Sequence, residues 1–273
     1  MLAKLEQLKS ILRSGGRTLV AYSGGVDSVF LAKVAHDTLG PAALAVIADS
    51  PSLPRRELNE ALAIGRQFNF PVRVIQTHEM ADANYTGNPI NRCYFCKSEL
   101  FDELAAIAKA EGWATIVYGE NASDNGDYRP GAKAATEYQV RAPLKEAGLT
   151  KTEIRQLSAQ FGLPTADKPQ MACLSSRIPY GEPVTTEALA RIEAAENVLR
   201  DLGFYDVRVR HHQTLARIEV GPEELTRLLE NGLREKVARA LKEVGYAYVT
   251  LDLEGYRRGS TNEIVMRKEE SKQ

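Results

Sequence analysis

The sequence predicts an α/β protein with a doubly wound, mostly parallel sheet and a smaller α+β domain after it. Three observations lead to this prediction. Between the N-terminus and Gly119, short apolar runs alternate with stretches in which apolar residues recur at the spacing of a helix, as in parallel βαβ units. A glycine-rich turn follows the first apolar run directly. From about residue 183, the strand-like runs instead alternate apolar and polar residues, which is typical of half-buried strands. We therefore expect two domains, residues 1–182 and 183–273.

The elements of the first domain follow from these runs. Continuous apolar stretches predict buried strands over residues 18–22, 42–48, 71–77 and 114–119. Apolar residues with helical spacing predict helices over residues 2–12, 29–40, 55–69, 97–111 and 150–161. Thr150 is the expected N-cap of the last helix, because Glu153 can complete a capping box. Residues 120–143 and 164–183 are predicted to be irregular, and irregular stretches of this length are often functional.

The small domain is predicted to mix helices and strands. Strands are expected over residues 205–211, 214–220 and 246–253, and helices over residues 185–202, 222–229 and 233–243. The last residues, 268–273, are charged and are expected to fray.

The turn at residues 23–28, Ser-Gly-Gly-Val-Asp-Ser, lies between the first strand and a helix. This order aims backbone N–H groups and a positive helix terminus at one anion. Two adjacent glycines let the backbone approach phosphates closely. The serine hydroxyls can donate to those phosphates, and Asp27 can bind the Mg²⁺ that accompanies a nucleotide. The turn matches neither the Walker A pattern nor the dinucleotide-binding pattern.

Composition excludes several classes of protein. The 273 residues include 35 basic and 36 acidic ones, for a formal net charge of −1, which gives no support to a broad nucleic-acid surface. The chain shows no signal-peptide pattern and no apolar segment of membrane length. Three cysteines are too few for a secreted disulfide framework. We expect a cytoplasmic protein of enzyme size, without a membrane or nucleic-acid partner.

Three cysteines form a second group of reactive residues. Cys93 and Cys96 precede a predicted helix, and Cys173 lies in the second irregular stretch. Because all three are expected on loops, a role as small buried hydrophobic residues is the weaker interpretation. A redox pair would leave Cys173 unexplained, and a zinc site would need a fourth ligand that no spacing identifies. Three thiolates can also hold a [4Fe–4S] cluster with one open iron.

Further polar residues lie at expected ligand positions. Glu120, Asn121 and Asp124 follow the fourth predicted strand, and ligands of open α/β sheets bind at the carboxyl ends of strands. We therefore expect these three residues to line a nucleotide or substrate pocket. Arg208 and Arg210 are two apart on a predicted strand and share one face, which is either a solvated face or a site for an anion.

The turn at residues 23–28 resembles the PP-loop signature, S-G-G-x-D-S, of the ATP pyrophosphatases. These enzymes cleave ATP between the α and β phosphates, and the loop holds the departing pyrophosphate. The resemblance implies that the β,γ-phosphates are bound by Ser23, Gly24, Gly25 and Ser28, with Asp27 on Mg²⁺.

Several further segments together resemble the LarE family, the PP-loop sulfur transferases of nickel-pincer cofactor biosynthesis. They are the two cysteine segments and the residues 118–125, 207–212 and 216–220. The resemblance covers essentially the whole chain. It implies adenylation of a pyridinium dicarboxylate mononucleotide by ATP, followed by formation of a thiocarboxylate, in an enzyme that forms homo-oligomers.

The resemblance also implies roles for single residues. In one branch of the family, the cysteine matching Cys173 gives up its own sulfur, and the residues matching Cys93 and Cys96 are absent. Since this chain has all three, it resembles the branch in which they hold a [4Fe–4S] cluster that carries an extra sulfide. Further residues are implied near the reacting phosphate or the substrate phosphate: Lys97, Ser176, Arg177, Arg208 and Arg210. Glu196 and Glu219 are candidate metal ligands in the small domain.

Two other functions fit parts of the sequence. A tRNA-thiolating PP-loop enzyme can also use three cysteines and a [4Fe–4S] cluster, but the balanced charge counts against RNA binding. A non-catalytic ATP-binding or iron–sulfur carrier protein would bind ATP without releasing pyrophosphate.

Overall fold

The computed structural model describes residues 1–124, 130–230 and 232–257. The chain divides into two compact units. The first comprises residues 1–85 and 90–171, and the second comprises residues 86–89 together with the chain from residue 172 onward. The predicted boundary after residue 182 falls inside the second unit, which therefore includes Cys173 and Arg177. The predicted tail at residues 268–273 lies outside the described residues.

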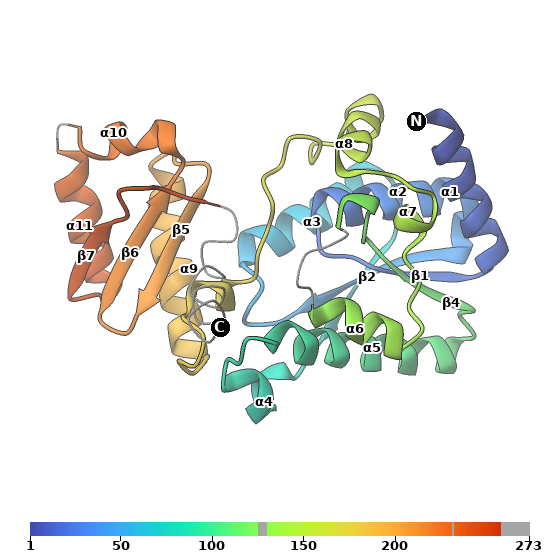
Figure 1. Cartoon of the computed structure of the whole chain (residues 1–273), viewed down its shortest axis with the longest axis horizontal. Coiled ribbons are helices and arrows are strands. Elements are labelled where there is room, and N and C mark those ends of the chain that lie inside the picture. Colours follow the sequence, from blue (N-terminus) through green and yellow to red (C-terminus); the bar gives the residue numbers. More distant parts are fainter. Residues whose placement is uncertain (125–129, 231, 258–273) are drawn as a thin grey trace, which may run out of the picture. The chain divides into compact units, whose positions relative to one another are not determined.

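The described residues of the first unit form a four-stranded parallel sheet with strand order β3-β2-β1-β4. The strands are β1 (Thr18–Ala21), β2 (Ala43–Asp49), β3 (Val72–Gln76) and β4 (Thr115–Tyr118). All four lie at predicted positions, and helices cover both faces of the sheet (Figure 1). The predicted doubly wound α/β fold is confirmed. Because the strands are parallel, the carboxyl ends of β1 and β4 meet at one edge of the sheet.

The helices between residues 1 and 171 match most predicted ones. They are α1 (Leu2–Gly15), α2 (Val26–Leu39), α3 (Arg55–Gln67), α4 (Ala83–Thr86), α5 (Arg92–Glu111), α6 (Pro130–Glu137), α7 (Pro143–Glu146) and α8 (Lys151–Gln160). Two differences matter for the site. The prediction that residues 120–143 are irregular is wrong for residues 130–137, which form α6. In addition, α5 begins five residues before its predicted start, so Cys93 and Cys96 lie in its first turns rather than on a loop.

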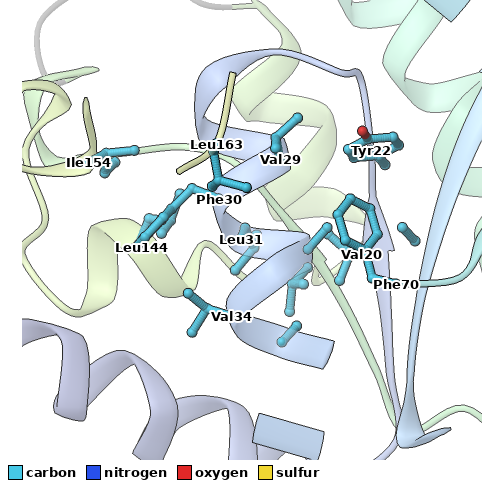
Figure 2. Packing of buried hydrophobic residues seen from close by; sticks show 14 of the residues in the cluster. Val20, Tyr22, Val29, Phe30, Leu31, Val34, Phe70, Leu144, Ile154 and Leu163 are labelled. Atoms are coloured by element: carbon cyan, nitrogen blue, oxygen red, sulfur yellow. The ribbon is translucent and has the colours of Figure 1, made fainter. Parts of the chain in front are cut away.

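The core of the first unit has two layers because successive strand residues point to opposite faces. Val20 and Tyr22 belong to a cluster with residues from α1, α2, α3, α7 and α8. Leu19 and Ala21 belong to another cluster with residues from α5 and α6. Figure 2 shows the first cluster, in which Phe30 of α2 lies among side chains from several elements. Burial of both faces explains why the strands read as continuous apolar runs.

The predicted capping box at the start of α8 is present. The Thr150 hydroxyl accepts a hydrogen bond from the Glu153 backbone N–H, and the Glu153 carboxylate accepts one from the Thr150 N–H. Lys4 of α1 also donates to that carboxylate at 2.8 Å. The hydrogen bond from Lys4 and those from Thr150 lower the pKa of Glu153 from 4.5 to about 2.

This depressed pKa predicts an acid-sensitive contribution to stability. At pH 7, Glu153→Gln should lower the free energy of unfolding by roughly 0.5–1 kcal/mol, because it removes the charge that Lys4 pairs with. A carboxyl group with a lowered folded-state pKa stabilises above its unfolded value, and the contribution is lost as the pH falls from about 4.5 toward 2. Urea unfolding of both proteins across this range is the measurement. If the difference in free energy of unfolding between the two proteins did not change with pH, the prediction would be contradicted.

The described part of the second unit has a three-stranded sheet with strand order β5-β6-β7. Its strands are β5 (Val207–His212), β6 (Leu215–Val220) and β7 (Tyr248–Leu251), and its helices are α9 (Thr186–Asp201), α10 (Leu225–Leu228) and α11 (Leu233–Glu243). β5 and β6 are antiparallel, whereas β6 and β7 are parallel. This sheet confirms the predicted α+β class for the small domain.

Residues on β5 alternate between two buried environments. Val207 and Val209 pack in an apolar cluster with α9 and α11. Arg208 and Arg210 point to the other face, yet they are only 5% and 7% exposed. The interpretation of Arg208 and Arg210 as a solvated strand face is therefore wrong, and each guanidinium must be stabilised inside the protein.

In the part of the chain that the structure describes, no helix combines the length and apolar character needed to span a bilayer.

Candidate active site

The glycine-rich turn joins the end of β1 to the start of α2. Gly24 has a positive φ of 74°, and a Cβ atom there would lie 2.7 Å from the Cβ of Ala61, so this position requires glycine. Gly25 is the N-cap of α2 and has no side chain to occupy the space ahead of the helix. Backbone N–H groups at this helix terminus can therefore bind an anion, as the sequence predicts.

The two serines of the turn are linked to each other. Their hydroxyl oxygens lie 3.0 Å apart, and the Ser28 hydroxyl also donates to the Gly25 carbonyl at 3.1 Å. The Ser23 hydroxyl accepts a long hydrogen bond of 3.4 Å from the Gly25 N–H. These contacts fix the shape of the turn. A bound phosphate would replace the weaker ones with charge-assisted hydrogen bonds.

Asp27 lies in the first turn of α2, and its two carboxylate oxygens have different environments. Oδ2 accepts hydrogen bonds from Lys151 at 2.7 Å and from Asn121 at 3.4 Å. Oδ1 is buried and accepts no hydrogen bond from any residue that the structure describes. Burial raises the pKa of Asp27, and the Lys151 ammonium opposes this shift without cancelling it. A buried, unsatisfied carboxylate oxygen fits the predicted Mg²⁺ ligand, since Mg²⁺ prefers oxygen donors and would neutralise the charge.

The residues that follow β4, which the sequence predicts to line a pocket, lie against the turn. A Cβ at Gly119 would lie 3.0 Å from the Ser28 nitrogen, so β4 ends directly against the start of α2. The Asn121 amide donates to Asp124 at 2.9 Å as well as to Asp27. Glu120 is buried and forms an ion pair with Lys145 at 2.8 Å. Burial alone would raise the pKa of Glu120, but hydrogen bonds from Lys145 and Tyr118 lower it.

Lys151 is a site residue that the sequence reasoning missed. It lies 124 positions from Asp27 in the chain. The sequence around Lys151 predicts only that this residue begins a capped helix. Ser123 holds the start of this helix in place, because its hydroxyl accepts a hydrogen bond from the Lys151 N–H at 3.0 Å. The Lys151 ammonium is thus a cation directed at the carboxyl edge of the sheet.

Removing this cation should slow ATP cleavage. Lys151→Gln is expected to reduce the rate of pyrophosphate release roughly 10- to 100-fold, the range for losing a hydrogen bond to a charged group. Lys151→Arg keeps the charge and should retain most of the rate. Pyrophosphate release at saturating ATP is the measurement. Equal rates for the Gln and Arg variants would exclude a role for the charge.

Lys97 lies on α5, near the end of β4. Its ammonium is 4.7 Å from the centre of the Tyr118 ring, a cation–π distance. A Cβ at Gly131 of α6 would lie 2.5 Å from the Lys97 side chain, so the glycine allows α6 to pack against it. The Lys97 ammonium therefore lies beside the last residue of β4.

The cysteines are divided between the two units. Cys93 is exposed, and Cys96 is half-buried on the same side of α5, three residues later. Cys173 is half-buried and is the N-cap of a short 3₁₀ helix, Leu174–Arg177. None of the three is a buried core residue. Among the described residues, no group of three or more His, Cys, Asp or Glu side chains is arranged to hold a metal ion. The thiolate donor set is nevertheless the type that iron–sulfur clusters use.

Buried arginine–glutamate pairs dominate the predicted phosphate site of the second unit. Arg177 contacts Glu196 through Nε and Nη2, at 2.8 and 3.0 Å. Arg210 contacts Glu219 in the same bidentate manner, at 2.9 and 2.7 Å. The Arg210 Nη1 atom also donates to the Ser176 carbonyl at 2.9 Å. Because both carboxylates are committed to guanidinium groups, their geometry favours ion pairing over the predicted role of Glu196 and Glu219 as metal ligands.

Arg208 lies beside an aspartate and an aromatic ring. Its Nη1 atom is 3.3 Å from Asp206, and its guanidinium lies 4.7 Å from the centre of the Tyr256 ring. Burial and the nearby positive charge of Arg177 lower the pKa of Arg208. A buried cation in a locally positive environment favours an anion beside it, which is consistent with the predicted substrate-phosphate role.

Known proteins resemble this chain over most of its length. It is 48% identical over 263 residues to an uncharacterized protein of Synechocystis sp., a match that covers 96% of this chain and 98% of that protein. It is 35% identical over 263 residues to the pyridinium-3,5-bisthiocarboxylic acid mononucleotide synthase of Lactiplantibacillus plantarum, covering 96% and 95% of the two chains. It is 29% identical over 250 residues to the tRNA-specific 2-thiouridylase of a Caulobacter species, covering 76% and 59%. No protein-family model matches the chain.

The parallel sheet, the turn at residues 23–28 and these similarities define an ATP-dependent enzyme of the PP-loop class. Within that class, the chain belongs to the LarE family of sulfur transferases, in agreement with the resemblance found in its sequence.

Proposed function

We propose that this enzyme adenylates a carboxylate of pyridinium-3,5-biscarboxylic acid mononucleotide and converts it to a thiocarboxylate. The observation that carries this proposal is the phosphate-binding turn with the unsatisfied Oδ1 of Asp27 beside it. The name of the L. plantarum synthase supports the choice of substrate. In the first step, a substrate carboxylate oxygen attacks the α-phosphorus of ATP. The bond to the bridging oxygen breaks, pyrophosphate leaves, and an acyl-adenylate remains.

The turn would stabilise the leaving pyrophosphate. The N–H groups at the start of α2 and the hydroxyls of Ser23 and Ser28 would donate to its oxygens. Asp27 would hold Mg²⁺, which neutralises phosphate charge when it is bound. Lys151 and Lys97 would supply further positive charge at the same edge of the sheet. Glu120, Asn121 and Asp124 would shape the pocket and orient Asp27 through the Asn121 amide.

The second unit would bind the phosphate of the mononucleotide. Arg208 is a candidate, because it is buried and cationic, and an added anion would stabilise its charge beside the Arg177 guanidinium. Arg210 and the Ser176 hydroxyl lie on connected segments and would contribute further donors. We do not assign this role to Arg177, because the Arg177 guanidinium already makes five donor contacts with protein oxygens.

The sulfur source is the finer part of the proposal. Cys173 would act either as donor or as cluster ligand. As donor, its Sγ attacks the acyl-adenylate carbonyl and AMP leaves; loss of the Cα proton then breaks the Cβ–S bond, which leaves dehydroalanine and the thiocarboxylate. In the alternative that we favour, Cys93, Cys96 and Cys173 hold a [4Fe–4S] cluster, and that cluster supplies an extra sulfide when bound. The presence of all three cysteines supports this alternative.

The proposal is tested by incubating the anaerobically purified protein with ATP, Mg²⁺ and the mononucleotide. Mass spectrometry should detect the thiocarboxylate product, and AMP and pyrophosphate should form only when the mononucleotide is present. ATP binding without pyrophosphate release would instead indicate a carrier protein.

A tRNA-thiolating function is the second candidate, since similarity to the 2-thiouridylase extends over 76% of this chain. It predicts tRNA binding that weakens steeply with salt and pyrophosphate release that depends on tRNA. The nearly balanced charge of the chain favours the small substrate.

A further inference from the structure

Arg177 is a buried arginine of the second unit, only 2% exposed. Its Nε and Nη2 atoms bind Glu196. Its Nη1 atom donates to the carbonyl oxygens of Ala172 and Cys173, at 2.7 and 2.9 Å, and lies 3.0 Å from the Ser176 hydroxyl. One side of the guanidinium is thus fixed by a carboxylate. The other side binds the carbonyl oxygens of two successive residues, Ala172 and Cys173.

Glu196 connects this arginine to the sheet. It is 2% exposed and lies on α9, and its Oε1 atom also accepts a hydrogen bond from the Val209 N–H of β5 at 3.0 Å. Burial disfavours its charge, but the Arg177 guanidinium outweighs that effect and lowers its pKa. A second connection runs from the Ser176 carbonyl to Arg210 of β5. The short segment that carries Cys173 is therefore attached to both α9 and β5 by charged hydrogen bonds.

These bonds restrict a segment that has little other regular structure. Residues 172–177 contain only one 3₁₀ turn, whose carbonyl oxygens need donors when they are buried. A buried ion pair adds little net stability over apolar packing, but it imposes one geometry on the groups that it joins. Nucleophilic attack depends on such fixed geometry, because a displacement of about 1 Å can cost a factor of 100 in rate.

We infer that Arg177 and Glu196 are positioning residues that fix the backbone of Cys173 for sulfur transfer. This inference rests on the proposed function. It predicts that, at saturating mononucleotide, loss of the pair slows the sulfur-transfer half-reaction much more than adenylation, because the phosphate-binding turn belongs to the other unit.

Full-length Arg177→Lys and Glu196→Gln test this inference. Glu196→Gln preserves shape and can still accept a hydrogen bond, so it guards against a folding failure of Arg177→Lys. Arg227→Lys is the matched control, because Arg227 donates to two other backbone carbonyls of the same unit, those of Leu202 and Gly203. The first readout is the amount of thiocarboxylate formed per pyrophosphate released. The second readout is the rate at which iodoacetamide alkylates Cys173 in protein that contains neither substrate nor cluster. Peptide mass spectrometry measures this alkylation over time.

We expect the thiocarboxylate yield per pyrophosphate to fall at least tenfold in both variants, with pyrophosphate release within threefold of wild type. Alkylation of Cys173 should accelerate at least fivefold, with no change in Arg227→Lys. Unchanged yield and alkylation in folded variants would overturn the inference, as would a parallel loss of both half-reactions. If wild type forms no thiocarboxylate, the proposed function fails, and the alkylation rates still decide whether the pair fixes the Cys173 segment.

Discussion

Asp27→Asn is expected to reduce substrate-dependent pyrophosphate release by about 10³-fold or more. The physical reason is the environment of this carboxylate. Oδ1 is buried without a hydrogen-bond donor among the described residues, so it is available to a cation, while Oδ2 is held by Lys151. The amide of asparagine carries no charge and would leave the Lys151 ammonium without its partner. The variant thus loses the Mg²⁺ ligand and the positioning of Lys151 together.

The matched control for this variant is Asp37→Asn on the same helix. Asp37 is exposed and forms only a local pair with Lys33, so its replacement should leave the rate within twofold of wild type. The measurement is pyrophosphate release across a range of Mg²⁺ concentrations. If Asp27→Asn kept the wild-type rate at low Mg²⁺, the assignment of Asp27 as a metal ligand would be wrong. A partial rate that recovers at high Mg²⁺ would support it.

The strands could be predicted because their pattern has a single physical cause. β1 and β2 are covered on both faces, and only apolar side chains are stable there, so their segments read as continuous apolar runs. The capped start of α8 could also be predicted, since Thr150 and Glu153 are three residues apart and interact locally. In both cases the information lies within a short stretch of sequence.

The start of α5 could not be predicted in the same way. Its N-cap residue, Asn91, makes no side-chain capping hydrogen bond, and its first turns are polar or aromatic around Cys93 and Cys96. The apolar spacing that defines this helix begins only at Leu100. The helix α6 is short and begins after residues that the structure does not describe, and α5 contributes to the apolar cluster against which it packs. Tertiary packing, rather than local propensity, defines these ends.

Pairings between distant residues account for what the sequence missed at the site. The sequence predicted that Asn121 would line a nucleotide or substrate pocket because it follows the end of a strand, and the structure shows that this strand is the neighbour of β1, so that Asn121 contacts Asp27. Nothing local indicated that Lys151 would reach the same carboxylate. Likewise, alternation placed Arg208 and Arg210 on one face of a strand but could not reveal that this face is buried. Periodicity shows which residues share a face of a strand, whereas the solvent exposure of that face depends on the elements that cover it.

Cys173→Ala is expected to abolish thiocarboxylate formation while pyrophosphate release continues, because adenylation precedes the sulfur step in the proposed mechanism. This separation of the two half-reactions is the direct test of the role of Cys173. The matched variants are Cys93→Ala and Cys96→Ala. They separate the two sulfur sources, because neither cysteine has a role if Cys173 gives up its own sulfur.

If the three thiolates hold a cluster, protein purified without oxygen should contain about four irons and a similar amount of acid-labile sulfide per chain. Each of the three variants should then lose the iron, the visible absorption and the thiocarboxylate product together. If the wild-type protein is colourless and iron-free, the cluster proposal is wrong, and Cys93→Ala and Cys96→Ala should keep the activity of one turnover. In that case the mass of the wild-type chain should fall by one H₂S after turnover, because elimination at Cys173 leaves dehydroalanine. Iron content and protein mass therefore discriminate between a catalyst that is reloaded with sulfide and one that is consumed by its own reaction.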